Sequence, residues 1–94
     1  REMLKIIAVC GMGIGTSVLL KMNTDKALKK LGMKGDVQAA DVGVAKGAAR
    51  DADIVLTSAE LAGELGSLPI PVKVVNNFMN VDEIAAAISD AMEK

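Results

Sequence analysis

A nearly continuous apolar run over residues 3–9 leads directly into a glycine-rich loop, and a helical pattern follows that loop. Lys5 is the one charged residue in the run, so the pattern predicts a strand that is buried on both faces. Three glycines then occur within residues 11–15, and glycines at this density permit a tight loop. The chain therefore begins as strand, loop and helix, which is how an α/β fold begins.

Strands and helices continue to alternate along the rest of the chain. After the strand over 3–9 and a helix that ends before Gly32, we expect strands over 36–40, 54–56 and 72–75 and helices over 44–50, 59–65 and 81–92. This alternation predicts a parallel sheet with helices on both faces and right-handed crossovers. Ligands of open α/β sheets bind beyond the carboxyl ends of the strands, and Cys10 has that position on the first strand.

Polar residues at the predicted helix starts suggest specific caps. The candidates are Thr16 or Ser17 for the first long helix, Thr57 in a capping box with Glu60 or Ser58 for the helix over 59–65, and Asn80 with Glu83 for the last helix. Thr57 and Ser58 are also expected at the same edge of the sheet as Cys10. The last helix also has an apolar stripe, which is expected to face the core: Val81, Ile84, Ala85, Ile88 and Met92.

The length and composition predict one domain with an aliphatic core. A chain of 94 residues is too short for two cores, so residues 1–94 are expected to form a single domain. Hydrophobic residues make up 51% of the chain, which is enough for a packed core, and Phe78 is the only aromatic residue. The net charge of −1 and the presence of a single aromatic residue argue against nucleic-acid binding.

The cysteine and histidine counts limit the chemistry further. One cysteine excludes an internal disulfide, and the absence of histidine excludes metal and haem sites built from His and Cys, so we expect no metal and no cofactor. No apolar run is long enough to cross a bilayer and no secretory leader is visible, so the sequence predicts a cytoplasmic protein. Without histidine, any covalent phosphoryl chemistry must use another side chain.

The loop after the first strand has the features of an anion site. A strand that enters a helix through glycines directs several backbone N–H groups into one concavity, and the helix dipole adds positive potential there. This field is expected to lower the pKa of the Cys10 thiol from its ordinary value of about 8.5. Cys10 is therefore the candidate acceptor of a phosphoryl group. The candidate phosphate-binding residues are Gly11, Met12, Gly13, Ile14, Gly15, Thr16 and Ser17.

Other phosphate-binding loops fit this sequence less well. The Walker loop and the dinucleotide-binding loop both fail at the required positions, because Thr16, Ser17 and Val18 stand where glycine or lysine is needed. The small tyrosine-phosphatase loop is closest in layout, but Thr16 occupies the place of its arginine and no Asp-Pro loop supplies a general acid. Loss of that arginine weakens the stabilisation of the transition state. A cysteine that accepts phosphate but hydrolyses it poorly is a carrier.

Two segments of the sequence resemble a known family. Residues 9–17 (VCGMGIGTS) and residues 52–64 (ADIVLTSAELAGE) resemble the enzyme IIB component of the bacterial phosphoenolpyruvate-dependent sugar phosphotransferase system (PTS). The resemblance covers nearly the whole chain and is strongest to the ascorbate-type branch, which is grouped with the lactose/cellobiose and galactitol IIB domains. The lactose and galactitol branches stay open, and the sequence does not name the sugar.

The resemblance implies a fold, a role and partners. The implied fold is a parallel sheet of four strands in the order 2-1-3-4, similar to the small tyrosine-phosphatase and flavodoxin-like arrangement. In such proteins the cysteine that matches Cys10 receives a phosphoryl group from a phosphohistidine on a IIA protein. It then passes the group to a sugar as the membrane IIC component translocates that sugar. The loop that matches Gly11 to Ser17 surrounds the phosphate.

Three alternatives remain beside this reading. A low-molecular-weight phosphatase is disfavoured by Thr16, a regulatory IIB-like module would use phosphorylation of Cys10 to change partner binding, and a redox role lacks a resolving cysteine. Met12 and Ile14 are expected to be exposed and could contribute to a protein contact. The lysines of the first helix are expected to form a solvated face, because Asp25 lies among them.

Overall fold

A computed structural model describes residues 3–9 and 14–92 of the chain, with the backbone alone described for residues 14–17. The elements alternate between strand and helix as predicted. In chain order they are β1 (Leu4–Val9), α1 (Ile14–Leu31), β2 (Gly35–Ala40), α2 (Val42–Ala48), the 3-10 helix η1 (Ala49–Asp51), β3 (Ile54–Thr57), α3 (Ala59–Leu65), β4 (Val72–Val74) and α4 (Val81–Met92).

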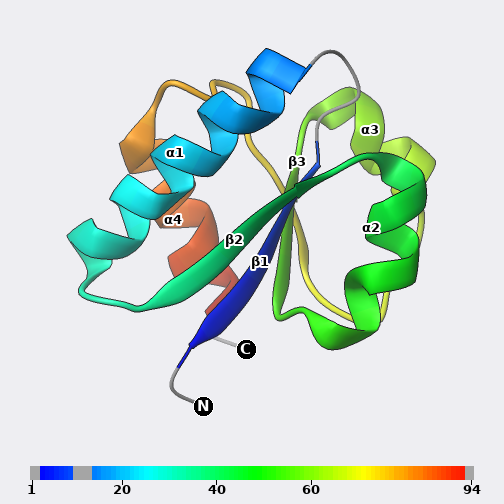
Figure 1. Cartoon of the computed structure of the whole chain (residues 1–94), viewed down its shortest axis with the longest axis horizontal. Coiled ribbons are helices and arrows are strands. Elements are labelled where there is room, and N and C mark those ends of the chain that lie inside the picture. The colour runs from blue at the N-terminus through cyan, green and yellow to red at the C-terminus, as the bar shows by residue number, and fades with distance from the viewer. Residues whose placement is uncertain (1–2, 10–13, 93–94) are drawn as a thin grey trace.

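The sheet is parallel and central. Over the described residues it contains four strands in the order β2-β1-β3-β4, which confirms the predicted architecture and strand order. Figure 1 shows α1 and α4 on one face of the sheet and α2 and α3 on the other. Both faces are thus covered, as the continuous apolar character of β1 requires.

Alternation along β1 divides the core between these two layers. Ile6 and Ala8 belong to the cluster that packs with buried residues of α1 and α4, whereas Ile7 and Val9 belong to the cluster that packs with residues of α2 and α3. Successive side chains of a strand point to opposite faces, so one strand supplies both cores. β1 is therefore the structural centre of the molecule.

The two ends of α1 differ in how well they were predicted. Gly32 adopts a positive φ of 72° directly after the helix, and the Met33 N–H donates to the Leu28 carbonyl over 2.9 Å, which confirms Gly32 as the stop. The predicted cap by Thr16 or Ser17 is wrong. The helix already begins at Ile14, so both residues lie inside its first turn and not before it.

Of the two residues expected to cap α3, one is confirmed and the other is wrong. Ser58 is the N-cap, and its side chain accepts a hydrogen bond from the Leu61 N–H, so the Thr57/Glu60 capping box is wrong. Thr57 is instead the last residue of β3, because the strand extends one residue beyond the expected 54–56. In this way Thr57 becomes part of the sheet.

The last helix follows its prediction with two changes. Asn80 caps α4 by accepting from the Glu83 N–H over 3.1 Å, but the Glu83 carboxylate accepts from the N–H groups of Asn76 and Asn77 and not from that of Asn80. The apolar stripe includes Ala91, which is 6% exposed, in place of Met92, which is 47% exposed.

The remaining boundaries shift by one or two residues. α2 spans Val42–Ala48 and continues as η1, where a helix over 44–50 was expected, and Asp41 caps it by accepting from the Val44 N–H. β4 ends at Val74, but the Val75 N–H still donates to the Thr57 carbonyl. No helix in the described part of the chain combines the length and apolar character needed to cross a bilayer.

Candidate functional site

The carboxyl ends of β1 and β3 lie side by side at the centre of the sheet. Val9, the last residue of β1, is the register partner of Thr57, the last residue of β3. The chain leaves β1 toward β2 on one side, whereas β3 lies on the other side of β1. Such a reversal of strand order is where open α/β sheets bind ligands. The fold therefore places its candidate site at the Val9–Thr57 edge.

The predicted site residues follow β1 at this edge. Cys10, Gly11, Met12 and Gly13 lie outside the described residues. Ile14, Gly15, Thr16 and Ser17 are the first residues of α1, a helix of 18 residues with no acidic residue in its first turn. Because the first N–H groups of a helix have no acceptor within it, this end of α1 offers donors and positive potential to an anion.

Thr57 lies at this edge, as the sequence suggested, but as a buried residue of the strand. Its side chain is 0% exposed, and its Oγ1 has no hydrogen-bond partner in the part of the chain that the structure describes. Sequence reasoning assigned Thr57 to a helix cap, because its spacing to Glu60 fits a capping box. The alternation from Val55 to Thr57 at the end of a buried strand is the signal that could have placed it in the sheet.

A shallow cleft of about 470 Å³ lies at the same edge of the sheet. Its lining residues come from α1, the start of α3 and the connection from β4 to α4: Leu19, Ser58, Ala59, Glu60, Val75, Asn76, Asn77 and Phe78.

Hydrogen bonds hold the β4–α4 side of this cleft in place. The Glu83 carboxylate accepts from the Asn76 N–H over 2.6 Å and from the Asn77 N–H over 3.2 Å. The Asn23 side chain of α1 donates to the Phe78 carbonyl over 2.7 Å. One wall of the cleft is therefore tied both to α4 and to α1.

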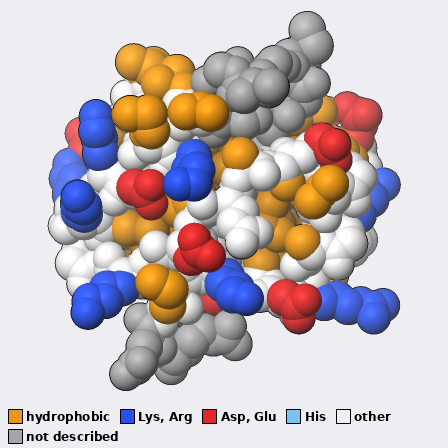
Figure 2. All heavy atoms as spheres, viewed as in Figure 1, with side chains coloured by type: hydrophobic (Ala, Val, Ile, Leu, Met, Phe, Trp, Pro, Cys, Tyr) orange, Lys and Arg blue, Asp and Glu red, His pale blue; other side chains and the backbone are white. Residues whose placement is uncertain are grey.

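Large apolar side chains are exposed beside this wall. Val18 and Met22 of α1 are 45% and 52% exposed, and Met79 of the β4–α4 connection is 63% exposed. Met79 lies close to α1, because its Sδ is 4.0 Å from the Asn23 amide nitrogen. Figure 2 shows hydrophobic side chains gathered on this side of the molecule, over α1 and the β4–α4 connection. We call Val18, Met22 and Met79 the apolar rim.

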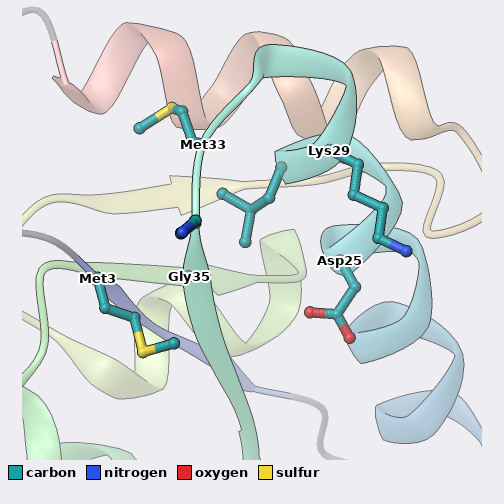
Figure 3. Close-up of a pocket in the computed structure, with 7 residues that line it drawn as sticks. Met3, Asp25, Lys29, Met33 and Gly35 are labelled. Carbon is teal, nitrogen blue, oxygen red and sulfur yellow. The ribbon is translucent and has the colours of Figure 1, made fainter.

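A second cleft, of about 400 Å³, lies at the opposite end of the sheet. Figure 3 shows Met3 and Met33 on either side of Gly35, with Asp25 and Lys29 extending from α1. This cleft adjoins the amino end of β1 and the carboxyl end of α1, so it is remote from the Val9–Thr57 edge.

Within the described residues, no three Asp, Glu, Cys or His side chains come together as a metal site.

The whole chain was then compared with known proteins. The family model for the lactose/cellobiose-specific IIB subunit of the PTS matches residues 5–90. The chain belongs to this IIB family. The fold described above is the fold of the family, and the chain is a component of a sugar phosphotransferase system.

Individual IIB relatives agree with this assignment. The ascorbate-specific PTS EIIB component of Mycoplasma pneumoniae is 38% identical over 90 residues, which is 95% of both chains. The ascorbate-specific EIIB component of Escherichia coli O157:H7 is 38% identical over 61 residues, which is 65% of this chain and 60% of that protein.

Solved IIB structures share the fold at lower identity. The cellobiose-specific IIB protein of Borrelia burgdorferi has a TM-score of 0.69 at 23% identity and covers 97% of this chain and 94% of its own. The lactose-specific IIB domain of Streptococcus pneumoniae has a TM-score of 0.61 at 16% identity, with coverage of 97% and 96%. At these identities the two structures establish the architecture alone.

Proposed function

We propose that Cys10 of this IIB component carries a phosphoryl group from a phosphohistidine on a IIA protein to a sugar of the L-ascorbate type, which the membrane IIC component presents. The observation that carries this proposal is the position of residue 10. It directly follows Val9 at the point where the strand order reverses, and it shortly precedes the start of α1. A nucleophile at this point can use the helix N-terminus to hold the oxygens of a phosphoryl group.

The transfer requires two displacements at phosphorus. In the first, the Cys10 thiolate attacks the phosphorus, the S–P bond forms, the P–N bond breaks and the bonding pair returns to the imidazole of the donor. In the second, a sugar hydroxyl oxygen attacks the phosphorus, the O–P bond forms, the S–P bond breaks and the thiolate is restored. The hydroxyl proton passes to water or to a base, and that base is not a histidine of this chain, which contains none.

The substrate class rests on the relatives and not on a sugar pocket. Relatives that are named ascorbate-specific match this chain at 38% identity, one of them over 95% of its length. Aromatic faces are the usual platform for sugars. This chain has a single aromatic residue, Phe78, so the cleft at the Val9–Thr57 edge offers little aromatic surface to a sugar. We therefore assign sugar selection to the membrane component.

The apolar rim fits the protein partner of this reaction. The rim is exposed beside the Val9–Thr57 edge, and it consists of Val18, Met22 and Met79. A donor protein must approach Cys10 at this edge. Apolar and methionine-rich surfaces next to a reacting group are typical of protein contacts. We assign this rim to the contact with the IIA protein.

The direct test is phosphorylation with purified components. The chain is mixed with phosphoenolpyruvate, the general carrier proteins of the system and a IIA protein of an ascorbate-type system, and the modified residue is located by mass spectrometry. We expect one phosphate on Cys10 and none in a Cys10→Ser variant. Phosphate on another residue, or on none, would refute the proposal.

The substrate is tested in a second step. Separate membrane vesicles, each with the IIC component of an ascorbate, lactose, cellobiose or galactitol system, are supplied with the phosphorylated chain and with the matching sugar. Loss of phosphate from the chain with L-ascorbate alone supports the assignment. Transfer to one of the other sugars would move the chain to another branch of the family, and transfer to none would favour a regulatory IIB-like module.

A further inference from the structure

Asn77 is the centre of the hydrogen bonds that hold the β4–α4 connection. Its N–H donates to the Glu83 carboxylate over 3.2 Å, and its carbonyl accepts from the Asn80 N–H over 3.0 Å. Its side-chain Oδ1 accepts from the Met79 N–H over 2.9 Å. An asparagine side chain that bonds to the backbone two residues later closes a turn. Asn77 thus fixes the course of the chain at Met79.

The α3–β4 connection shows that such bracing is not a general property of the loops. In the β4–α4 connection the Asn76 N–H also donates to the Glu83 carboxylate, and the Phe78 carbonyl accepts from a side chain of α1, so residues 76–80 each take part in a hydrogen bond. Residues 67–70 of the α3–β4 connection take part in none of the hydrogen bonds found among the described residues. A segment that is braced at every position has little conformational freedom left to lose when a partner binds it.

The residue that this bracing presents is an exposed methionine. Met79 is 63% exposed, the highest value among the large hydrophobic side chains that the structure describes. Its Sδ lies 4.0 Å from the Asn23 amide nitrogen, so the side chain extends to α1 and completes the apolar rim there. A side chain this exposed adds little to the core, whereas exposed methionines are common at binding surfaces. The fixed backbone at Met79 therefore serves binding.

We infer that Asn77 is a positioning residue for the contact with the IIA protein, because it holds Met79 in place within the apolar rim. The inference rests on the proposed function, which assigns this rim to the IIA protein, and it adds the residue that prepares the surface. Ordering a loop during binding costs free energy, and a loop that is already fixed avoids that cost. Asn77 therefore lowers the KM for the phosphorylated IIA protein and takes no part in the transfer step.

Four variants separate positioning from stability. Asn77→Ala removes the acceptor of the Met79 N–H, whereas Asn77→Asp keeps it, since aspartate closes the same turn. Met79→Ala removes the presented side chain, and a chain with both alanine substitutions completes a double-mutant cycle. KM and kcat are measured for transfer from the phosphorylated IIA protein in physiological salt, which screens the added charge of the aspartate. Urea unfolding shows that each chain is folded under the conditions of the assay.

The inference predicts a distinct pattern across these variants. Asn77→Ala and Met79→Ala each raise the KM about three- to tenfold, with kcat within about twofold of wild type. Asn77→Asp keeps the wild-type KM within about twofold, because its side chain still accepts from the Met79 N–H. The chain with both alanines has the KM of Met79→Ala, since a loosened backbone matters only while there is a methionine to position.

The inference and the proposed function fail in different ways. If wild type gains phosphate on Cys10 and Asn77→Ala keeps the wild-type KM, only the inference is refuted. It is also refuted if the two alanine effects on KM multiply, if Asn77→Asp is as impaired as Asn77→Ala, or if kcat falls at unchanged KM. Asn77→Gln, whose longer side chain does not close the same turn, replaces Asn77→Ala if that chain does not fold. If wild type gains no phosphate on Cys10, the proposed function is refuted and the inference with it.

Discussion

The side-chain amide of Asn23 donates a hydrogen bond of 2.7 Å to the backbone carbonyl of Phe78, across 55 positions of sequence. Asn23 is buried in α1. Phe78 belongs to the connection between β4 and α4, which lines the cleft at the Val9–Thr57 edge. This bond therefore joins the helix that begins at the candidate site to the wall of the cleft.

Asn23→Asp tests that connection. Aspartate has the shape of asparagine but cannot donate, so its carboxylate would face the Phe78 carbonyl. We expect a loss of about 2–3 kcal/mol in the free energy of unfolding, measured by urea denaturation. The control is Met22→Gln at the exposed neighbouring position, which should change stability by less than about 0.5 kcal/mol. Equal losses in the two variants would contradict the role of the bond.

Glu83→Gln tests the support of the same wall from α4. The Glu83 carboxylate accepts from two backbone N–H groups, those of Asn76 and Asn77, whereas a glutamine has a single carbonyl oxygen and would set its NH₂ group against the other. We expect a loss of about 1–2 kcal/mol and faster hydrogen exchange at both amides. Asp82→Asn removes a charge from the adjacent position, where the ion pair with Lys30 is exposed, and should have little effect.

Two glycine substitutions are expected to have opposite signs. A Cβ at Gly35 would lie 2.6 Å from the Leu28 Cδ1 and 3.1 Å from the Leu4 carbonyl oxygen, so Gly35→Ala should destabilise the fold by about 1–3 kcal/mol. A Cβ at Gly63 in α3 meets nothing within 4 Å, so Gly63→Ala should stabilise the fold by about 0.5–1 kcal/mol through helix propensity. The unfolding temperature of each variant is measured. A Gly35→Ala chain that unfolds at or above the wild-type temperature would argue against the close packing of β2 on α1.

The end of α4 gives a test of which residue faces the core. Ala91 is 6% exposed and Met92 is 47% exposed. Ala91→Met adds volume to a packed site and should cost about 1–3 kcal/mol, while Met92→Gln should stay within about 0.5 kcal/mol of wild type. Both losses are measured by chemical denaturation. If Met92→Gln cost more stability than Ala91→Met, Met92 would face the core, as the sequence suggested.

The apolar rim is tested through the kinetics of phosphorylation. Met22→Ser should raise the KM for the phosphorylated IIA protein several-fold and leave the unfolding free energy within about 0.5 kcal/mol of wild type, because the side chain is 52% exposed. Met3→Ser is the matched control, since Met3 is 53% exposed but lies at the opposite end of the sheet. A KM that rises equally in both variants would exclude a specific contact at the rim.

The sequence alone was sufficient to predict the order of the elements, and it led to the proposal that the site follows the first strand. The apolar run that ends at Val9, the glycines after it and the stop at Gly32 are local signals, because burial on both faces of a strand and a positive φ each leave a pattern over a few residues. Connectivity alone then puts Cys10 at the carboxyl end of a strand. The alternation of strand and helix is also visible in the local pattern, and it predicted a parallel sheet with helices on both faces.

Only the tertiary structure decided which of several local options each residue adopts. Thr57 fits a capping box by spacing but lies in the sheet, because pairing with Val9 extends β3 by one residue. Met92 has the helical spacing of a core residue, but the packing of α4 on the sheet buries Ala91. Contacts between distant segments set these outcomes, and a local pattern does not contain them. The burial of Thr57 beside Val9 is likewise a property of the assembled sheet.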